Sequence, residues 1–154
     1  MHGRPLLVEV QALTTKVTTG VTPRRSAQGI ESSRLAMLLA VLERRSAIAF
    51  GLLEVYASVV GGVRLNDPGS DLAVCLALAS AALDKPAHSD IVALGEVGLG
   101  GEVRHVSHLE RRIIEAERMG FRRVIIPVNS KAPDNGRSTL VRVATVNDAL
   151  AQAL

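Results

Sequence analysis

The feature that most constrains this chain is an apolar run at residues 71–84. It reads DLAVCLALASAALD and consists almost entirely of Ala, Leu and Val. A helix that is apolar on every side has no face for solvent and is therefore buried. We expect a central helix here, preceded by a turn at residues 66–70. Lys85 and Pro86 should end the helix, because proline cannot continue it.

Six other segments have the alternating or short apolar pattern of strands. They are residues 6–13, 52–60, 91–96, 102–106, 123–128 and 139–145. Residues 14–29 are rich in Thr, Gly and Arg and predict an extended continuation of the first strand into an exposed loop. The glycine-rich turn at residues 98–101 should join the third and fourth of these strands as an antiparallel hairpin.

A helix is also predicted between Ser32 or Ser33 and about Arg45. Either serine can cap its start. Apolar residues recur at i, i+3, i+4 and i+7 along one face, namely Leu35, Leu38, Leu39 and Leu42. Arg44 and Arg45 lie in the last turn, where positive charge complements the helix dipole.

Two later helices are predicted from their caps. Ser107 and Glu110 have the spacing of a capping box, which predicts a helix that starts at Ser107. Gly120 is placed as its left-handed C-terminal cap. Asn147 should cap a short final helix. The inward-facing stripe of the first of these helices is Leu109, Ile113 and Ala116.

Together these elements predict an α/β fold, an α+β sandwich in which mixed sheets pack against helices. The 154 residues are enough for one domain with a sizeable core. We therefore expect a single domain over residues 1–154.

Arginine dominates the basic residues of the chain. Only Lys16, Lys85 and Lys131 among the 18 basic residues are lysine, and the formal net charge is +3. Arginine presents a planar fork to phosphates and carboxylates. Pairs of arginines at 24–25, 44–45, 111–112 and 122–123 have three interpretations: solvated faces, phosphate contacts or salt bridges between subunits.

Several classes of protein lack support in the sequence. No phosphate-binding loop of the form GxxxxGK[ST] occurs, and the lone Cys75, in an apolar run, predicts a buried thiol without disulfide or zinc chemistry. His105 and His108 span a junction between a strand and a helix, so we expect no metal site with Glu102 or Glu110. No signal-peptide pattern and no apolar run of about 20 residues is present. We expect a cytoplasmic protein with no membrane contact.

Ser70 is the one candidate nucleophile. It follows Gly69 at the start of the central helix, where free backbone amides could stabilise an oxyanion. A serine hydroxyl also needs a partner base. A serine at a helix start is more often a simple cap, and both interpretations remain open on the residues alone.

Several segments, in order along the chain, resemble the C-terminal domain of the bacterial RadA (Sms) family of DNA repair proteins. They are LLVEVQALT, SSRLAMLLAVLERR, VVGGVRLNDPGSDLAVCLALASAALDKP, GEVGLGGEVRHV and RRIIEAERMGF. The resemblance covers about residues 5–154. Residues 95–127 also resemble the C-terminal half of the proteolytic domain of Lon.

The resemblance implies a Lon-like fold without proteolysis. Ser70 falls at the position of the protease serine, and Glu110 falls where the protease has its activating lysine. Arg111 and Arg112 do not replace that base, because arginine stays protonated. The serine–lysine dyad is therefore broken, and no catalytic residue and no cofactor are expected in this chain.

The resemblance also implies a role. Members of the family carry a zinc motif and a RecA-like ATPase, so ATP, Mg²⁺ and Zn²⁺ are expected in regions that this chain does not contain. The intact protein would be an ATP-driven branch-migration helicase in recombination. The Lon-like domain would assemble with itself in a ring, expected to be hexameric, and contact single-stranded or branched DNA.

Arg24 and Arg25 in the exposed loop, followed by Arg44 and Arg45, are the residues expected to contact DNA. Two alternatives stay open. One is a residual serine hydrolase that uses Ser70. The other is a pure oligomerisation scaffold without DNA contact.

Overall fold

The computed structural model describes residues 7–17, 20–134 and 136–154. Its strands are β1 (Val10–Lys16), β2 (Arg25–Gln28), β3 (Leu53–Val59), β4 (Ile91–Ala93), β5 (Glu96–Val97), β6 (Val103–Arg104), β7 (Arg123–Pro127) and β8 (Thr139–Val143). Its helices are α1 (Ser32–Ser46), the short 3₁₀ turn η1 (Pro68–Ser70), α2 (Asp71–Leu83), α3 (Leu109–Arg118) and α4 (Val146–Ala153).

The first sheet has the order β1–β3–β2, with β1 antiparallel and β2 parallel to the central strand β3. Its side chains alternate between two faces, as strand geometry requires. Ala57 is buried on the inner face, and its neighbour Tyr56 pairs with the exposed Leu13 on the outer face. The sheet therefore has one face for the core and one for solvent.

The second sheet, β4–β7–β8, is parallel throughout. Parallel sheets are normally covered on both faces, and the central strand β7 shows this directly. Ile125 lies in the larger apolar cluster with α2 and α4, whereas Val124 and Ile126 lie in a smaller cluster with α3. Because neighbouring side chains on a strand point to opposite faces, α3 covers the face of this sheet that is turned away from α2.

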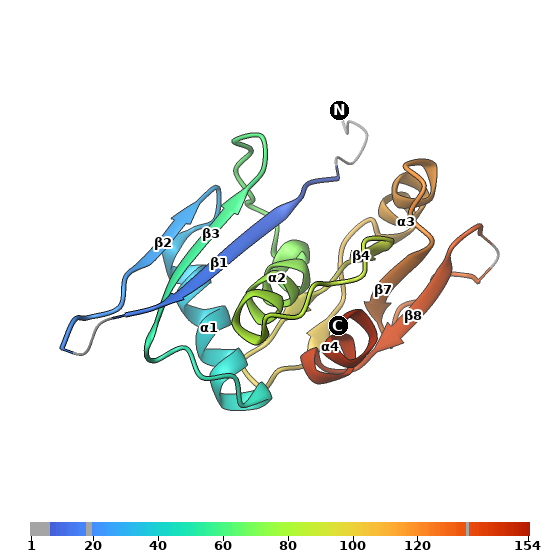
Figure 1. Ribbon diagram of the computed structural model, residues 1–154. Coiled ribbons are helices and arrows are strands. Elements are labelled where there is room, and N and C mark those ends of the chain that lie inside the picture. The colour runs from blue at the N-terminus through green and yellow to red at the C-terminus, as the bar shows by residue number, and fades with distance from the viewer. Residues whose placement is uncertain (1–6, 18–19, 135) are drawn as a thin grey trace.

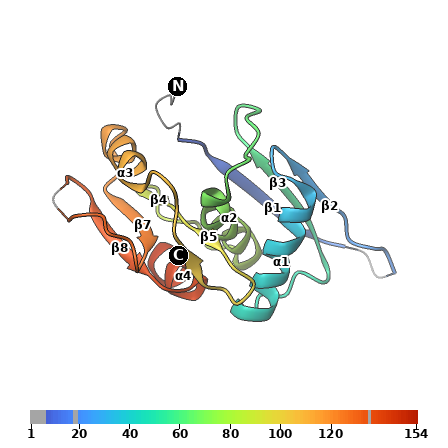
Figure 2. The same cartoon turned by 180° about the vertical axis from the view of Figure 1, so that it is seen from behind.

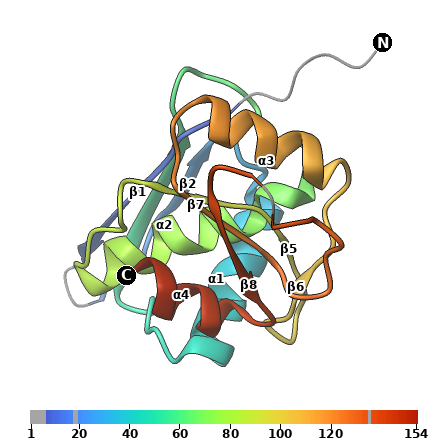
Figure 3. The same cartoon turned by 90° about the vertical axis from the view of Figure 1, so that its right-hand side faces the viewer.

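The layers therefore run from the first sheet through helices to the second sheet and then α3. Figure 1 shows α2 between the two sheets, with α1 and α4 beside it. In Figure 3 the second sheet, α3 and α4 lie in front of the first sheet. The central position predicted for the apolar helix is confirmed, since Leu72, Cys75 and Leu78 are all fully buried. The α/β class is confirmed as well.

The predicted N-caps of α1 and α3 are wrong. The residue before α1 is Glu31, which makes no side-chain capping bond, so neither Ser32 nor Ser33 caps this helix. Helix α3 begins at Leu109, because His108 adopts a left-handed conformation with φ 55° and carries no side-chain cap. Ser107 therefore lies in a turn and forms no capping box with Glu110. The capping box of the described chain is instead at Thr145 and Asp148, where α4 begins.

Two further boundaries differ from the predicted ones. Asn147 is not the cap of α4; its side-chain amide donates to the carbonyl of Arg45 at 2.9 Å. The strand expected at residues 91–96 is divided, because the chain leaves the second sheet after β4 and forms the β5–β6 hairpin. Gly120 does have the predicted left-handed backbone, with φ 93°.

Among the described residues, no helix is both long enough and apolar enough to cross a membrane.

Candidate functional site

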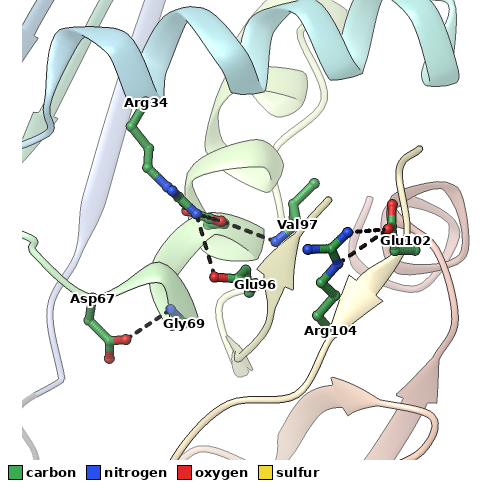
Figure 4. Close-up of polar contacts among 8 residues, drawn as sticks. Arg34, Asp67, Gly69, Glu96, Val97, Glu102 and Arg104 are labelled. Atoms are coloured by element: carbon green, nitrogen blue, oxygen red, sulfur yellow. Dashed lines mark hydrogen bonds and ion pairs between the residues drawn. The ribbon is translucent and has the colours of Figure 1, made fainter. Parts of the chain in front are cut away.

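Ser70 is the last residue of η1 and immediately precedes α2. The sequence places a turn here because Pro68 fixes its own backbone and Asp67 can bond to the amides that follow it. Asp67 Oδ1 accepts the Gly69 N–H at 2.9 Å, as Figure 4 shows. Ser70 occupies the N-cap position of α2, as the cap interpretation predicts, but its side chain makes no capping hydrogen bond.

The backbone amides around Ser70 already have partners within the protein. Those of residues 69, 70, 71 and 72 donate to Asp67 Oδ1, Asp67 O, Pro68 O and Gly95 O. A tetrahedral intermediate needs donors aimed at its developing oxyanion. The free amides expected at this helix start are therefore not present, and Ser70 lacks the simplest form of an oxyanion hole.

A buried carboxylate follows Ser70 directly. Asp71 is 3% exposed, and its Oδ1 accepts a hydrogen bond from Arg34 Nε at 2.7 Å. The second oxygen, Oδ2, accepts from Arg34 Nη2 and from the Val97 N–H, the latter at 3.1 Å. Arg34 also lies 3.9 Å from Glu96 Oε2. This network ties α1, α2 and β5 together beside Ser70 (Figure 4).

The pKa of Arg34 is raised above its usual value, first by the hydrogen bond to Asp71 and then by nearby carboxylates, against the effect of burial. The sequence interpretation missed Arg34. A signal was available, because Arg34 precedes the buried Leu38 by four residues, which places both on one side of α1. An arginine at the margin of an apolar stripe is a candidate for an ion pair, because burial of a charge is costly without a partner.

A cavity of about 470 Å³ opens on the other side of Ser70. Its polar lining includes Ser70, Asn66, Asp67, His108 and three arginines, Arg64, Arg111 and Arg112. Arg112 forms an ion pair with Asp67 and has a side chain that is only 18% exposed. Its guanidinium also lies over Gly69, where an added Cβ would meet Arg112 Nη1 at 2.7 Å.

The resemblance to Lon aligned Glu110 with the lysine of the protease. Glu110 is exposed and is not part of the cavity lining. None of the three lysines lines the cavity either, although all three belong to the described residues. Within this part of the chain, Ser70 therefore shares its cavity with arginines and with His108 but with no amine.

The four arginines expected to contact DNA lie in different local settings. Arg25 is in strand β2 and not in a loop as predicted; its guanidinium donates to the carbonyls of Leu53 and, at 2.9 Å, Phe50. Arg45 Nε donates to the Leu99 carbonyl at 3.3 Å. Arg24 and Arg44 are exposed.

The segment after α1 connects the two arginine pairs. The N–H of Phe50 donates to Glu43, the residue before Arg44, at 3.1 Å, while the carbonyl of Phe50 accepts from Arg25. The fold thus brings both pairs close to the segment around Phe50. Two of the four guanidinium groups, those of Arg25 and Arg45, already bond to backbone carbonyls.

The remaining chemical candidates, Cys75, His88 and His105, do not line the cavity beside Ser70. Cys75 is fully buried, and this burial raises the pKa of its thiol. His88 lies beyond the C-terminal end of α2, and His105 lies after β6. No group of three or more His, Cys, Asp or Glu residues placed to hold a metal ion occurs in the described ranges.

Comparison with known proteins finds one family model and a set of close relatives. The family described as subunit ChlI of Mg-chelatase matches residues 60–130, less than half of the chain. DNA repair protein RadA of Escherichia coli K12 is 45% identical over 150 residues, which is 96% of this chain and 32% of that protein. DNA repair protein RadA of Synechocystis is 40% identical over 98% of this chain and 30% of that protein.

DNA repair protein RadA of Mycobacterium tuberculosis H37Rv is 43% identical over 147 residues, or 96% of this chain and 30% of that protein. The chain therefore spans about a third of the length of the curated relatives that it matches. Nearly all of this chain is similar to one region of these longer proteins.

Proposed function

We propose that this chain is the Lon-like, non-proteolytic region of a RadA-type DNA repair protein, and that it acts in ring assembly and DNA contact. The observation that carries the proposal is an identity of 40–45% over 96–98% of the chain to proteins named DNA repair protein RadA. An ATP-driven step, with its Mg²⁺, and a zinc motif would lie in the two thirds of such a protein that this chain does not span.

The surroundings of Ser70 support the non-proteolytic part of the proposal. A serine nucleophile needs a neighbouring base and donors for the oxyanion. In the described residues, the backbone amides beside Ser70 already donate to other groups of the protein, and Glu110 lies outside the cavity. Arginines line the cavity instead, and arginine cannot act as a base at ordinary pH.

The two arginine pairs near Phe50 support the proposed DNA contact. Arg24 and Arg44 are exposed and can reach phosphates. Arg25 and Arg45 are held on backbone carbonyls, so they would contribute positive potential more than direct bonds. A ring needs head-to-tail contacts between copies, and exposed arginines can also pair with acidic residues of a neighbouring subunit.

Size-exclusion chromatography coupled to light scattering tests the proposal, with and without a single-stranded oligonucleotide at low salt. We expect oligomers that bind DNA. Oligomers without DNA affinity would instead support a pure scaffold. A monomer without DNA affinity would contradict both parts of the proposal.

The double variant Arg24→Glu/Arg44→Glu then tests the DNA surface. Loss of two phosphate contacts should reduce the slope of log K against log salt by about 1.4 for single-stranded DNA. Arg122→Glu/Lys131→Glu makes the same change of charge at two exposed positions elsewhere and should leave the slope unchanged. Equal slopes for the two variants would remove the assignment.

A serine hydrolase remains the second candidate because Ser70 and His108 line the same cavity. A fluorophosphonate probe distinguishes the two functions. We expect no labelling of the native chain. Labelling that disappears in Ser70→Ala would establish a reactive serine and overturn the non-proteolytic assignment.

A further inference from the structure

The cavity beside Ser70 has an excess of positive charge that the proposed function does not use. Arg64 enters it from the segment after β3, while Arg111 and Arg112 enter it from the first turn of α3. Asp67 is the one carboxylate in the described lining. The lining therefore carries three guanidinium groups against one carboxylate.

Both carboxylate oxygens of Asp67 already have partners within the protein. One of its oxygens forms the ion pair with Arg112, and the other accepts the Gly69 N–H. Arg64 and Arg111 are exposed, and among the described residues neither has a carboxylate within salt-bridge distance. Two guanidinium charges at this cavity are thus left without neutralisation.

The rest of the cavity is suited to a small organic anion. Its apolar lining consists of Leu7, Val8, Val10, Val63, Leu65, Ala73, Ala93 and Leu94. Its volume of about 470 Å³ lies within the range of about 300–1,000 Å³ that is typical of small-molecule sites. An apolar wall with a cationic side accommodates a ligand that has an uncharged organic part and an anionic end.

The charge decides which anion fits best. A phosphate monoester carries a charge of about −1.5 to −2 at pH 7, which matches two unpaired guanidinium groups better than a single carboxylate does. Guanidinium groups also bond to phosphate through two parallel N–H donors. We propose that this cavity binds the phosphate monoester of a nucleotide, either free or at the end of a DNA strand.

The backbone amides at the start of α2 do not contribute to this site, because they are bonded within the protein. Binding would rest on the side chains of Arg64 and Arg111, with Ser70 and Asn66 as neutral donors beside them. Arg112 would hold the wall of the site through Asp67. Figures 1 and 2 place α3 and residues 20–24 at opposite ends of the molecule. None of the four arginines expected to contact DNA lines the cavity, so this site is separate from them.

Calorimetric titration at low salt with thymidine 5′-monophosphate and with thymidine tests the proposal. The two probes differ only in the phosphate, and we expect binding of the nucleotide alone. Arg64→Ala/Arg111→Ala should weaken this binding at least about tenfold, which corresponds to about 1.4 kcal/mol. Both residues are exposed and lack acidic partners in the described chain, so the variant should keep its fold.

Arg122→Ala is the matched control, since it removes an exposed arginine that does not line the cavity. A 5′-phosphorylated oligonucleotide compared with its 5′-hydroxyl form distinguishes the two sources of the phosphate. Preference for the phosphorylated strand that is lost in Arg64→Ala/Arg111→Ala assigns the site to strand ends. Binding of the free nucleotide without such a preference assigns it to a mononucleotide.

The proposal is overturned if the native chain binds neither the nucleotide nor the phosphorylated strand. It is also overturned if thymidine binds as tightly as its monophosphate, or if Arg122→Ala weakens binding as much as the double variant. The titration with a free nucleotide requires no ring and no long DNA. A failure of the proposed ring function therefore does not imply a failure here.

Discussion

At the scale of single residues, the carboxylate of Asp71 organises the region around Ser70. It is almost fully buried, yet all its bonds come from two other elements, α1 and β5. A buried charge is tolerated only where a partner and hydrogen bonds replace water. Arg34 and the Val97 N–H supply these here, and thereby fix where the β5–β6 hairpin meets the start of α2.

Replacing Asp71 by Asn should therefore destabilise the fold. Breaking a buried ion pair costs about 3–5 kcal/mol, and we expect the lower end because the Arg34 side chain is still 34% exposed. Urea denaturation measures the change. Glu96→Gln, which alters the weaker 3.9 Å contact to the same arginine, should cost less than about 1 kcal/mol. Equal losses in the two variants would contradict the assigned role of Asp71.

The thiol of Cys75 should be unreactive in the folded chain. Its burial raises its pKa, so the reactive thiolate is scarce even at mildly alkaline pH. Alkylation by iodoacetamide at pH 8, followed by mass spectrometry, should be slow in buffer and rapid in denaturant. Rapid labelling in buffer would mean that α2 opens far more often than a central helix should.

At the scale of elements, two segments have the same capping-box spacing, and only one forms the box. Thr145 has an extended backbone with φ −135°, so its side chain can reach the N–H of Asp148. His108 has φ 55° and precedes α3, which starts at Leu109, two residues beyond Ser107. Leu109 packs in the smaller core cluster, which fixes the start of α3 by packing instead of by a cap.

Thr145→Ala and Ser107→Ala form a matched pair of variants that tests this difference. Loss of a threonine N-cap costs about 1 kcal/mol, and we expect this loss at Thr145 only. The Ser107 variant should be nearly neutral, because its side chain caps no helix. Thermal denaturation compares the two; a comparable loss at Ser107 would restore the capping box predicted for α3.

At the scale of the whole molecule, strand β7 contributes side chains to both apolar clusters. Ile125 contributes to the larger cluster, and Val124 and Ile126 contribute to the smaller one. All three are fully buried. Neither cluster can lose its side of β7 without disturbing the other, since alternate residues of this one strand belong to the two clusters.

Calorimetry should therefore show a single unfolding transition, with a van't Hoff enthalpy close to the calorimetric one. Ile125→Ala and Val124→Ala remove side chains from opposite faces of β7. Each should lower the temperature of the same transition, and the isoleucine variant should cost about 2–5 kcal/mol. Two separate transitions in either variant would show that the clusters unfold independently.

The sequence by itself determined those features that depend on neighbouring residues. The apolar run of α2, the leucine face of α1, the hairpin at residues 96–104 and the glycine after α3 all follow from local spacing and backbone preference. These patterns also located Ser70 at the start of a buried helix. The resemblance to Lon likewise indicated, from the chain alone, that Glu110 stands where the protease has a lysine.

Tertiary structure decided whatever depends on partners far along the chain. Asp71 pairs with Arg34 from a different helix. The backbone amides around Ser70 donate to Asp67 and to the distant Gly95. Arg64 lines the same cavity as Arg111 and Arg112, which come from a separate segment. Periodicity gives the face on which a side chain lies but not the partner that it meets. A site built from contacts between segments is therefore specified only when the sheets and helices pack.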